Sequence, residues 1–589
     1  MAAAVALSVA PQLDAQSLSG EITVERTITP AERPANRLGS VSPGITLEPV
    51  SQKPLKAAPY NGVGTLSRSL TRLEPASYAD TFAVDPWRGY VSAGYFPSLN
   101  LGVEAGYDLI ATRNTRLGTY LNYSGNSYKV PARYGDGEKR PSVAAHSFTV
   151  GAALSATVAE KRRLDAEARY TFSSVTMPWR QHEIDGEAND VNLRVAYSDK
   201  HSQLPWKAAV RFGHFGFRHD TPADIAFVYG APETTKLKPA GESVLGIDGA
   251  LAWREDNHSW RLDLGTELQW LNRLARIWPI AVPSQLTGDH VVADSYWNEG
   301  AKLLSVTSLT PSYNLVRDKF TAHLGVRVDL STGPRGNKFR VAPDIDLAWT
   351  PSGRVALGIR LGGGEKLNTL AGLNALSPWL VPAFSYERSN LPLVFDADLS
   401  FGPFAGVTIR PFGGFALADS WLMPATVMSS GINQYQYQDL HGGHYGLELS
   451  YAYGSLVRAT ASVEGASASD SDAESGYYLW RDRARWQAVV KVETRPIEPL
   501  RVELGLRYRG DRKSYLLKAA NYENLSWYEN DGTVDLGDIC NLSLSASWRF
   551  SPALSVFVNV DNMLCRRYEL VAGVPSQRLG GLVGVTYKF

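Results

Sequence analysis

Two glycine-rich stretches hold residue types that could do chemistry. HGGHYG contains His441 and His444 and could serve as the oxyanion loop of an ester hydrolase, but that chemistry also needs a serine in a G-x-S-x-G turn, which the sequence lacks. GGGEKL, residues 362–367, lacks the Gly-Lys-Ser/Thr ending of a phosphate-binding loop, so we interpret it as a loop that contains glycines. We therefore predict that the protein is not an enzyme and holds no cofactor.

An acidic stretch and the cysteines are further candidates. SDSDAESG brings Asp470, Asp472 and Glu474 together, but it lacks the ligand spacing of a calcium loop, and we interpret it as a solvated loop tip without a metal site. Cys540 and Cys565 are expected on the two strands of one hairpin, where an exported protein could join them by a disulfide. Their positions in the strand alternation differ, so a β-bulge would be needed, and the disulfide is left open.

The composition does not suggest a soluble protein of several domains. The chain has 589 residues and is rich in Gly (52), Tyr (28) and Trp (15), with 59 basic and 59 acidic side chains. This balance argues against a nucleic-acid partner, which would favour clustered excess Lys and Arg. No segment approaches the ~18 to 20 uninterrupted apolar residues that a membrane helix needs.

Segments of alternating polarity recur from residue 86 to the end. In LDLGTELQW, the side chains of Leu262, Leu264 and Leu268 alternate with those of Asp263 and Glu267. The same period of two recurs in LRVELGLRYR and FTAHLGVRVDL. It is typical of strands with one apolar and one polar face.

The connections between these strands indicate the kind of sheet. VAEKRR, WREDNHS, VRDK, WTPSG, AYGS and RFSPA each join two strands tightly, whereas residues 271–300, 362–393, 415–440 and 510–534 are interpreted as long loops. Short turns on one side and long loops on the other are typical of outer-membrane barrels. From WRGYVSAGYF to GGLVGVTYKF we count about 22 strands. We predict an all-β, antiparallel transmembrane barrel over residues 86–589, surrounded by the outer-membrane lipids of a Gram-negative bacterium.

The aromatic residues and the last strand support a membrane location. Six tryptophans are expected on the outward face next to short turns, where Trp favours the water–lipid interface: Trp206, Trp253, Trp260, Trp349, Trp486 and Trp548. The last strand ends with Val585, Tyr587 and Phe589 on one face. An even strand count lets it pair with the first strand, which closes the barrel.

The polar face is predicted to line the lumen with charges of both signs. Opposite charges on neighbouring strands favour cross-strand ion pairs, unlike the single-sign ring that selects one type of ion, and a hydrated wall without specificity is the alternative. The candidates are Glu104, Asp108, Arg169, Arg211, Asp248, Arg261, Asp263, Glu267, Arg327, Asp344, Asp346, Arg360, Glu448, Arg458, Arg501, Glu503 and Arg507.

The stretch FVNVDNMLCRRYELVAG precedes the final strand and resembles the last strands of TonB-dependent receptor barrels. In that family an Asn-apolar-x-Asn element precedes a basic pair and a Tyr. The matching residues are Asn559, Val560, Asn562, Arg566, Arg567 and Tyr568. The ending with Val585, Tyr587 and Phe589 looks like the signal that the barrel-assembly machinery reads. The resemblance covers about residues 86–589 and implies a receptor-like transport barrel.

The N-terminal part departs from that family. Residues 1–15 are interpreted as the remnant of a signal peptide, with Leu13 and Ala15 at the spacing of a cleavage site. Residues 16–85 form a Pro-rich segment, expected in the periplasm or the lumen, which is too short and irregular for the folded plug of the family. The chain is therefore similar to plugless receptor-like barrels of the Bacteroidota.

The missing plug leads to two functional hypotheses. A wide barrel must be filled, by the N-terminal segment, by long loops or by a partner. Without a visible gate, we interpret the protein as a structural or anchoring subunit of an outer-membrane complex for assembly, secretion or surface proteins. Its partners would be lipoproteins or other barrels. The alternative is an outer-membrane transporter or channel for a bulky solute.

Overall fold

The fold is known from a computed structural model that describes most of the predicted barrel. It describes residues 87–97, 100–112, 114–131, 140–158, 162–179, 182–199, 204–218, 241–255, 257–273, 303–333, 336–379, 388–427, 433–468, 484–519 and 528–589. The predicted signal remnant (1–15), the segment 16–85 and the acidic stretch with Asp470, Asp472 and Glu474 lie outside the described residues.

The described residues form strands and one short helix. The first part of the chain holds β1 (Gly89–Phe96), β2 (Asn100–Ala111), β3 (Thr115–Lys129), β4 (Ser142–Val158), β5 (Arg162–Trp179), β6 (His182–Asp199), β7 (Trp206–Phe217), β8 (Gly241–Glu255), β9 (His258–Arg273), β10 (Leu303–Arg317), β11 (Phe320–Thr332), β12 (Lys338–Ser352) and β13 (Val355–Leu367). The second part holds α5 (Leu370–Leu376), β14 (Arg388–Phe404), β15 (Val407–Val427), β16 (Asn433–Tyr453), β17 (Val457–Ala468), β18 (Ala484–Ile497), β19 (Leu500–Ala519), β20 (Tyr528–Asp535), β21 (Ile539–Arg549), β22 (Leu554–Asp561), β23 (Glu569–Val571), β24 (Val574–Pro575) and β25 (Gly580–Lys588).

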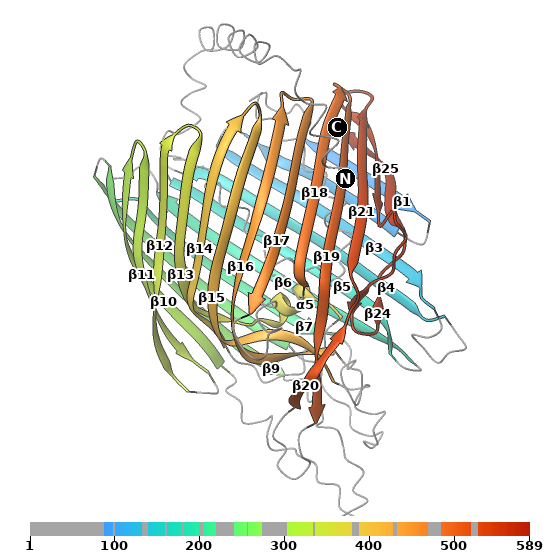
Figure 1. The fold of residues 1–589 in the computed structure, drawn as a ribbon. Coiled ribbons are helices and arrows are strands. Elements are labelled where there is room, and N and C mark those ends of the chain that lie inside the picture. Colours follow the sequence, from blue (N-terminus) through green and yellow to red (C-terminus); the bar gives the residue numbers. More distant parts are fainter. Residues whose placement is uncertain are drawn as a thin grey trace, which may run out of the picture.

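The strands close into one antiparallel ring, as the alternation and the turns predict (Figure 1). Consecutive strands pair from β1 to β19, and β20 and β21 pair in succession with β19, so that together they form one strand of a ring of 22. β22 pairs with β21 and β25, and β23 and β24 form a separate hairpin. The predicted fold class is therefore confirmed. No helix among the described residues is long and apolar enough to cross a membrane.

The ring closes where β1 pairs with β25. The main-chain N–H groups of Arg88 and Gly89 both donate to the Phe589 carbonyl at 2.9 Å, and the Phe589 N–H donates back to the Gly89 carbonyl at 2.9 Å. Farther along, the hydroxyls of Ser92 and Thr586 are 2.8 Å apart. Both edges of the sheet are thereby paired, which removes the exposed strand edges that favour aggregation.

The two faces of the strands differ as the sequence predicts. On β7, Val210 and Phe212 are 48% and 40% exposed on one face, and Arg211 lies on the other. Trp253 and Trp260 face each other across the turn between β8 and β9 and are 61% and 62% exposed. Large exposed apolar side chains over a whole sheet face are costly in water and favourable in lipid.

Several boundaries differ from the prediction. Residues 415–427 and 433–440 belong to the long strands β15 and β16 rather than to a loop, and residues 362–367 and 510–519 extend β13 and β19. On the long-loop side, β1 and β2 are joined by residues 97–99 alone. Trp486 was predicted beside a short turn, but it is the third residue of β18 and lies near the opposite end of that strand.

Candidate functional site

One face of the wall carries ion pairs between neighbouring strands. The Arg211 guanidinium of β7 lies between two carboxylates, 3.2 Å from Asp248 of β8 and 3.1 Å from Glu267 of β9. All three side chains are roughly one-third to one-half exposed, so solvent screens these ion pairs. They fix the positions of the side chains but contribute little to the stability of the barrel.

Other predicted lumen residues form ion pairs too, either within one strand, as for the first two pairs that follow, or between strands. Arg261 contacts Asp263, Arg327 contacts Asp329, Arg360 contacts Asp346, Arg410 contacts Glu448, Lys491 contacts Glu503, Arg501 contacts Glu493, Arg169 contacts Asp190 and Asp344 contacts His323. Arg116 at the tight-turn end contacts Asp108, and Asn122 donates to Glu104. The wall therefore carries both signs in alternation, without a ring of one sign among these pairs.

The loop after β13 folds back against this charged face, and in Figure 1 its helix α5 lies inside the ring. Thr369 caps the helix by accepting from the Gly372 N–H at 3.0 Å. Glu242 of β8, on the same face as Asp248, accepts from the Ala371 N–H at 2.9 Å. The first turn of α5 is thus held by a carboxylate from a distant strand, which satisfies an N–H that has no partner within the helix.

Further contacts hold this segment, residues 368–379, across the interior. Gln269 of β9 donates to Glu242 at 2.7 Å and to the Asn368 carbonyl at 3.2 Å. At the far side, Asn374 donates to the hydroxyl of Ser173 on β5 at 3.4 Å. We call residues 368–379 the first inner segment. It reaches from the β13–β14 side of the ring to β5, and so spans the interior.

A second inner segment, residues 562–579, folds against the wall between β19 and β3. It contains the small hairpin of β23 and β24. The Tyr128 hydroxyl of β3 donates to the Pro575 carbonyl at 2.8 Å, and Arg512 of β19 donates to the Glu569 carbonyl at 3.0 Å. Asn562 donates to the Gln577 carbonyl at 2.8 Å and so ties the two ends of the segment together.

The two inner segments share one apolar cluster with the wall. Leu370 and Leu373 of α5 are 1% and 5% exposed, and Val571 and Val574 of the second segment are 0% and 2% exposed. The other buried members are Val130, Val143, Val175, Ala188, Phe215, Leu271, Leu304, Val306, Leu367, Trp379, Ile539, Tyr568 and Leu570. Strands β4 to β7, β9, β10, β13 and β21 contribute buried members, and Tyr128 of β3 packs against them, so the cluster spans the ring near its long-loop end.

The long hairpin β15–β16 narrows the same end. Residues 425–427 at the end of β15 pair in parallel with residues 515–517 of β19, although β16, β17 and β18 separate the two strands in the ring. The hairpin therefore passes over the ends of the shorter strands β17 and β18. Backbone pairing as well as apolar packing closes this side of the barrel.

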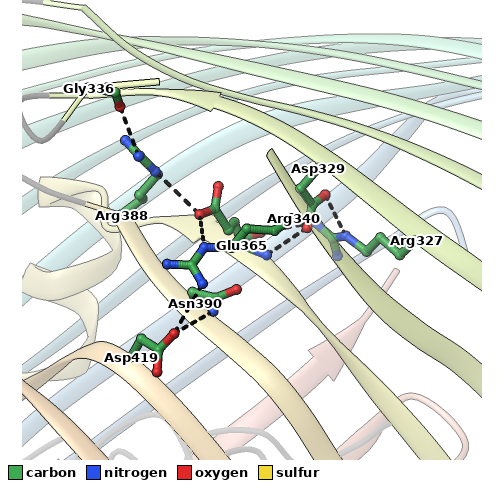
Figure 2. Close-up of polar contacts among 8 residues, drawn as sticks. All are labelled: Arg327, Asp329, Gly336, Arg340, Glu365, Arg388, Asn390 and Asp419. Atoms are coloured by element: carbon green, nitrogen blue, oxygen red, sulfur yellow. Dashed lines mark hydrogen bonds and ion pairs between the residues drawn. The ribbon is translucent and has the colours of Figure 1, made fainter. Parts of the chain in front are cut away.

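A buried ionic network holds both ends of the loop that carries α5 (Figure 2). Glu365, near the end of β13, is 1% exposed and accepts from Arg340 at 2.9 Å and from Arg388 at 3.4 Å. Arg388 begins β14 and also donates to the Gly336 carbonyl at 3.0 Å. The loop thus leaves and re-enters the wall at two residues that contact each other.

The network continues over β11, β12 and β15. Arg340 also contacts Asp419 at 3.1 Å, and Asn390 donates to the same carboxylate at 3.0 Å. Asp329, 1% exposed, accepts from Arg327 at 2.8 Å and from the Glu365 N–H at 2.8 Å. Three arginines and three carboxylates balance in charge, which is what makes such burial tolerable.

A β-bulge and a glycine make the network fit. The pairing of β13 with β14 shifts between Gly362 and Gly364, with the extra residue on β14, and after this irregularity the Glu365 side chain lies beside Arg340 on the charged face. Gly364 has a φ of 123°, and a Cβ there would lie 2.5 Å from the Arg327 guanidinium. GGGEKL is therefore part of a strand and supplies the central residue of the network, whereas the sequence was interpreted as a simple loop.

The other chemical candidates have structural partners. His444 of β16 lies 3.0 Å from Asp396 and 3.1 Å from Glu464, as a link between β14, β16 and β17. Within the part of the chain that the structure describes, no group of three His, Cys, Asp or Glu side chains is arranged to hold a metal ion.

Both cysteines are free in the structure. Cys540 lies on β21 opposite Tyr508. Cys565 is not on the partner strand, because β22 ends at Asp561, and it lies exposed in a turn with a φ of 54°. The hairpin expected from the sequence is thus shorter than the two cysteine positions require.

The sequence left long loops as one possible filling of the barrel, but it did not locate the inner segments or the centre of the ionic network. A signal for the first was present, since Thr369 followed by Leu370, Leu373 and Leu376 is a helix start with apolar residues three apart. Apolar residues in a loop of a membrane barrel indicate that the loop packs inward. The sequence carried no signal for Glu365, because the alternation of β13 assigns it to the outer face and only the irregular backbone at Gly362–Gly364 brings it to the inner face.

Comparison with known proteins gives no match in sequence and a clear one in structure. No family model matches the sequence, and no curated protein matches it. Three solved structures illustrate the likeness. The FrpB iron transporter from Neisseria meningitidis (F3-3 variant) has a TM-score of 0.61 and 14% identity, covering 85% of this chain and 81% of that one.

The other two are similar to the same degree. A mutant of the ferric enterobactin receptor PfeA from Pseudomonas aeruginosa has a TM-score of 0.58 and 12% identity, covering 85% of this chain and 80% of that one. The copper transporter OprC has a TM-score of 0.58 and 12% identity, with the same coverage of 85% and 80%. At such low identity the likeness shows the fold alone, a 22-strand barrel structurally like TonB-dependent receptors.

Proposed function

We propose that the protein is an outer-membrane transporter for a bulky solute, which passes through the interior of the barrel. The observation that carries the proposal is a 22-strand ring like those of solved transporters, with a wall of paired charges around its interior. A polar wall lets a solute exchange its hydration for contacts with side chains of either sign.

The fold neighbours suggest which solutes to test first. FrpB and OprC are described as iron and copper transporters and PfeA as a ferric enterobactin receptor, so metal chelates are the first class. The structural or anchoring role predicted from the sequence, with lipoproteins or other barrels as partners, is the competing proposal. No feature of the described residues favours it.

The test measures binding and passage in the purified full-length chain. Ferric and cupric chelates, and the same chelators without metal, are titrated while tryptophan fluorescence is followed. Proteoliposomes then report whether a bound chelate crosses. We expect saturable binding of at least one chelate, weakened in Arg211→Gln, because this change alters a wall contact between Asp248 and Glu267.

Lys319→Gln is the matched control, because Lys319 is exposed in the tight turn between β10 and β11. Binding that changes equally in both variants would mean that the interior is not the path. Absence of binding and of passage for every solute, together with copurification of one stoichiometric lipoprotein or barrel, would favour the anchoring role instead.

A further inference from the structure

We propose that the first inner segment, residues 368–379, is a gate that swings away from the far wall to open the barrel, and that the barrel thus carries its own closure in a loop. The inference rests on the proposed transport function, and it names the moving part. Its basis is the difference between how the strand residues that flank this segment are held and how the segment itself is held.

At the near end the segment is fixed by strand pairing and charge. Leu367 pairs with Arg388 in the β13–β14 ladder, and Glu365 contacts the same arginine. This end has a continuous main-chain ladder and a buried ionic network, which give a high free energy of local opening.

Within the segment itself the contacts are of a different kind. At its start, Glu242 and Gln269 bind the first turn of α5 through side chains, and Asn368 donates to the Ser389 hydroxyl at 2.9 Å; farther along, Asn374 donates to Ser173 at 3.4 Å. The apolar contacts of Leu370 and Leu373 add to these hydrogen bonds. Contacts of this kind separate without breaking any strand pairing, so a hinge at the near end lets the segment leave the wall as one piece.

The second inner segment contributes buried side chains to the apolar cluster that the gate joins. Val571 and Val574 are buried in the same apolar cluster as Leu370 and Leu373. Opening would expose this cluster to the lumen, which is unfavourable in water and makes the closed state the resting one. A solute with apolar surface would offset that cost when it takes the place of the segment.

The experiment releases the gate and then locks it, with single-channel conductance in planar bilayers as the readout. Leu373→Asp puts a charge into the apolar cluster, and we expect conductance to rise by about tenfold over the wild type, because a buried unpaired charge favours the open state. Leu456→Asp is the control for the added charge, since Leu456 lies exposed in the tight turn between β16 and β17. Faster electrophoretic migration without heating shows that each variant is a folded barrel.

The lock is a disulfide between Asn374→Cys and Ser173→Cys in the Leu373→Asp chain, with Cys540→Ser and Cys565→Ser to prevent other pairing. We expect low conductance after oxidation and high conductance after reduction. The matched control is Thr149→Cys with Thr171→Cys, whose hydroxyls are 3.0 Å apart on the paired strands β4 and β5. It joins wall to wall, so its conductance should not depend on oxidation.

Two results would overturn the gate. One is a folded Leu373→Asp barrel that conducts like the wild type, and the other is a conductance that stays high when the lock is oxidised. The proposed function fails separately: conductance that follows the lock without transport of any chelate leaves the gate standing. A chelate that crosses the oxidised, locked protein as fast as the reduced one would retain transport and remove the gate.

Discussion

The ionic network around Glu365 gives the sharpest test of how the wall is stabilised. The change is Glu365→Gln, which keeps the shape of the side chain and removes its charge. Glu365 is 1% exposed and contacts Arg388, which is 4% exposed, so both groups lie away from water. The substitution deprives a buried guanidinium of its carboxylate while leaving the packing in place.

The expected loss of stability depends on which contacts Arg340 and Arg388 retain after the substitution. Removing one partner of a buried ion pair costs about 3 to 5 kcal/mol. Arg340 is 34% exposed and retains Asp419 at 3.1 Å, so its share is small after solvent screening. Most of the cost therefore comes from Arg388, and we expect the free energy of unfolding to fall by about 3 kcal/mol.

The assay is denaturant unfolding of the purified barrel in detergent micelles, followed by tryptophan fluorescence. Arg388→Gln and the double variant complete a cycle, in which the coupling energy should be about 1 to 3 kcal/mol. Arg116→Gln is the control, because Arg116 is 72% exposed in its pair with Asp108 and should contribute about 1 kcal/mol or less. A Glu365→Gln effect no larger than this control, or strict additivity in the cycle, would refute the reasoning.

Three further predictions concern the bulge, the seam and the lipid interface. Gly364→Ala should reduce the free energy of unfolding by about 1 to 3 kcal/mol, and so lower the denaturant midpoint, because Gly364 has a φ of 123° and a Cβ would collide with Arg327. An unchanged midpoint would show that the strand can shift. Deleting Phe589 removes three main-chain hydrogen bonds across the seam, each worth about 1 kcal/mol, so the folded fraction in refolding gels should fall. A folded fraction equal to that of the wild type would mean that the seam closes without these bonds. Trp253→Phe with Trp260→Phe should reduce the quenching of fluorescence by lipids brominated near the headgroup, because both side chains are exposed beside a tight turn; unchanged quenching would place this turn outside the interface.

The frame of the barrel follows from the sequence because its signals are local. Asp263 and Leu264 alternate in β9 as expected, since a strand has no freedom to place adjacent side chains on the same face. The turn at residues 318–319 joins β10 and β11 as VRDK indicates. Each such signal involves neighbours in the chain, and antiparallel pairing of consecutive strands needs no further information.

The interior was hard to predict because it depends on residues far apart in the sequence. Glu365 belongs by strict alternation to the face of Ile359 and Leu361, but the irregular backbone at Gly362–Gly364, where Gly364 has a φ of 123°, brings it to Arg340 on the other face. The docking of α5 depends on Glu242, which precedes Ala371 by 129 residues. Neither contact leaves a periodic pattern, so local rules cannot find them.

The seam between β1 and β25 has a consequence for how the barrel folds. The hydroxyls of Ser92 and Thr586, which meet across it, are 494 residues apart in the sequence, whereas the antiparallel pairings around the rest of the ring join strands that lie close together in the sequence. Contact order is therefore low along the whole wall and very high at one place. Each doubling of a closed loop adds only about 0.6 kcal/mol of entropy cost, so the seam is not weak at equilibrium.

The same distance makes the seam slow to form, because folding rates fall as contacts become less local. Hairpins can form in order along the chain, β1 with β2 among them, while the main-chain N–H and C=O groups on the seam edge of β1 stay unpaired. Until β25 arrives, that waiting edge can recruit a strand from another molecule. Misassembly should therefore concentrate at β1, and its risk lasts until the ring is complete.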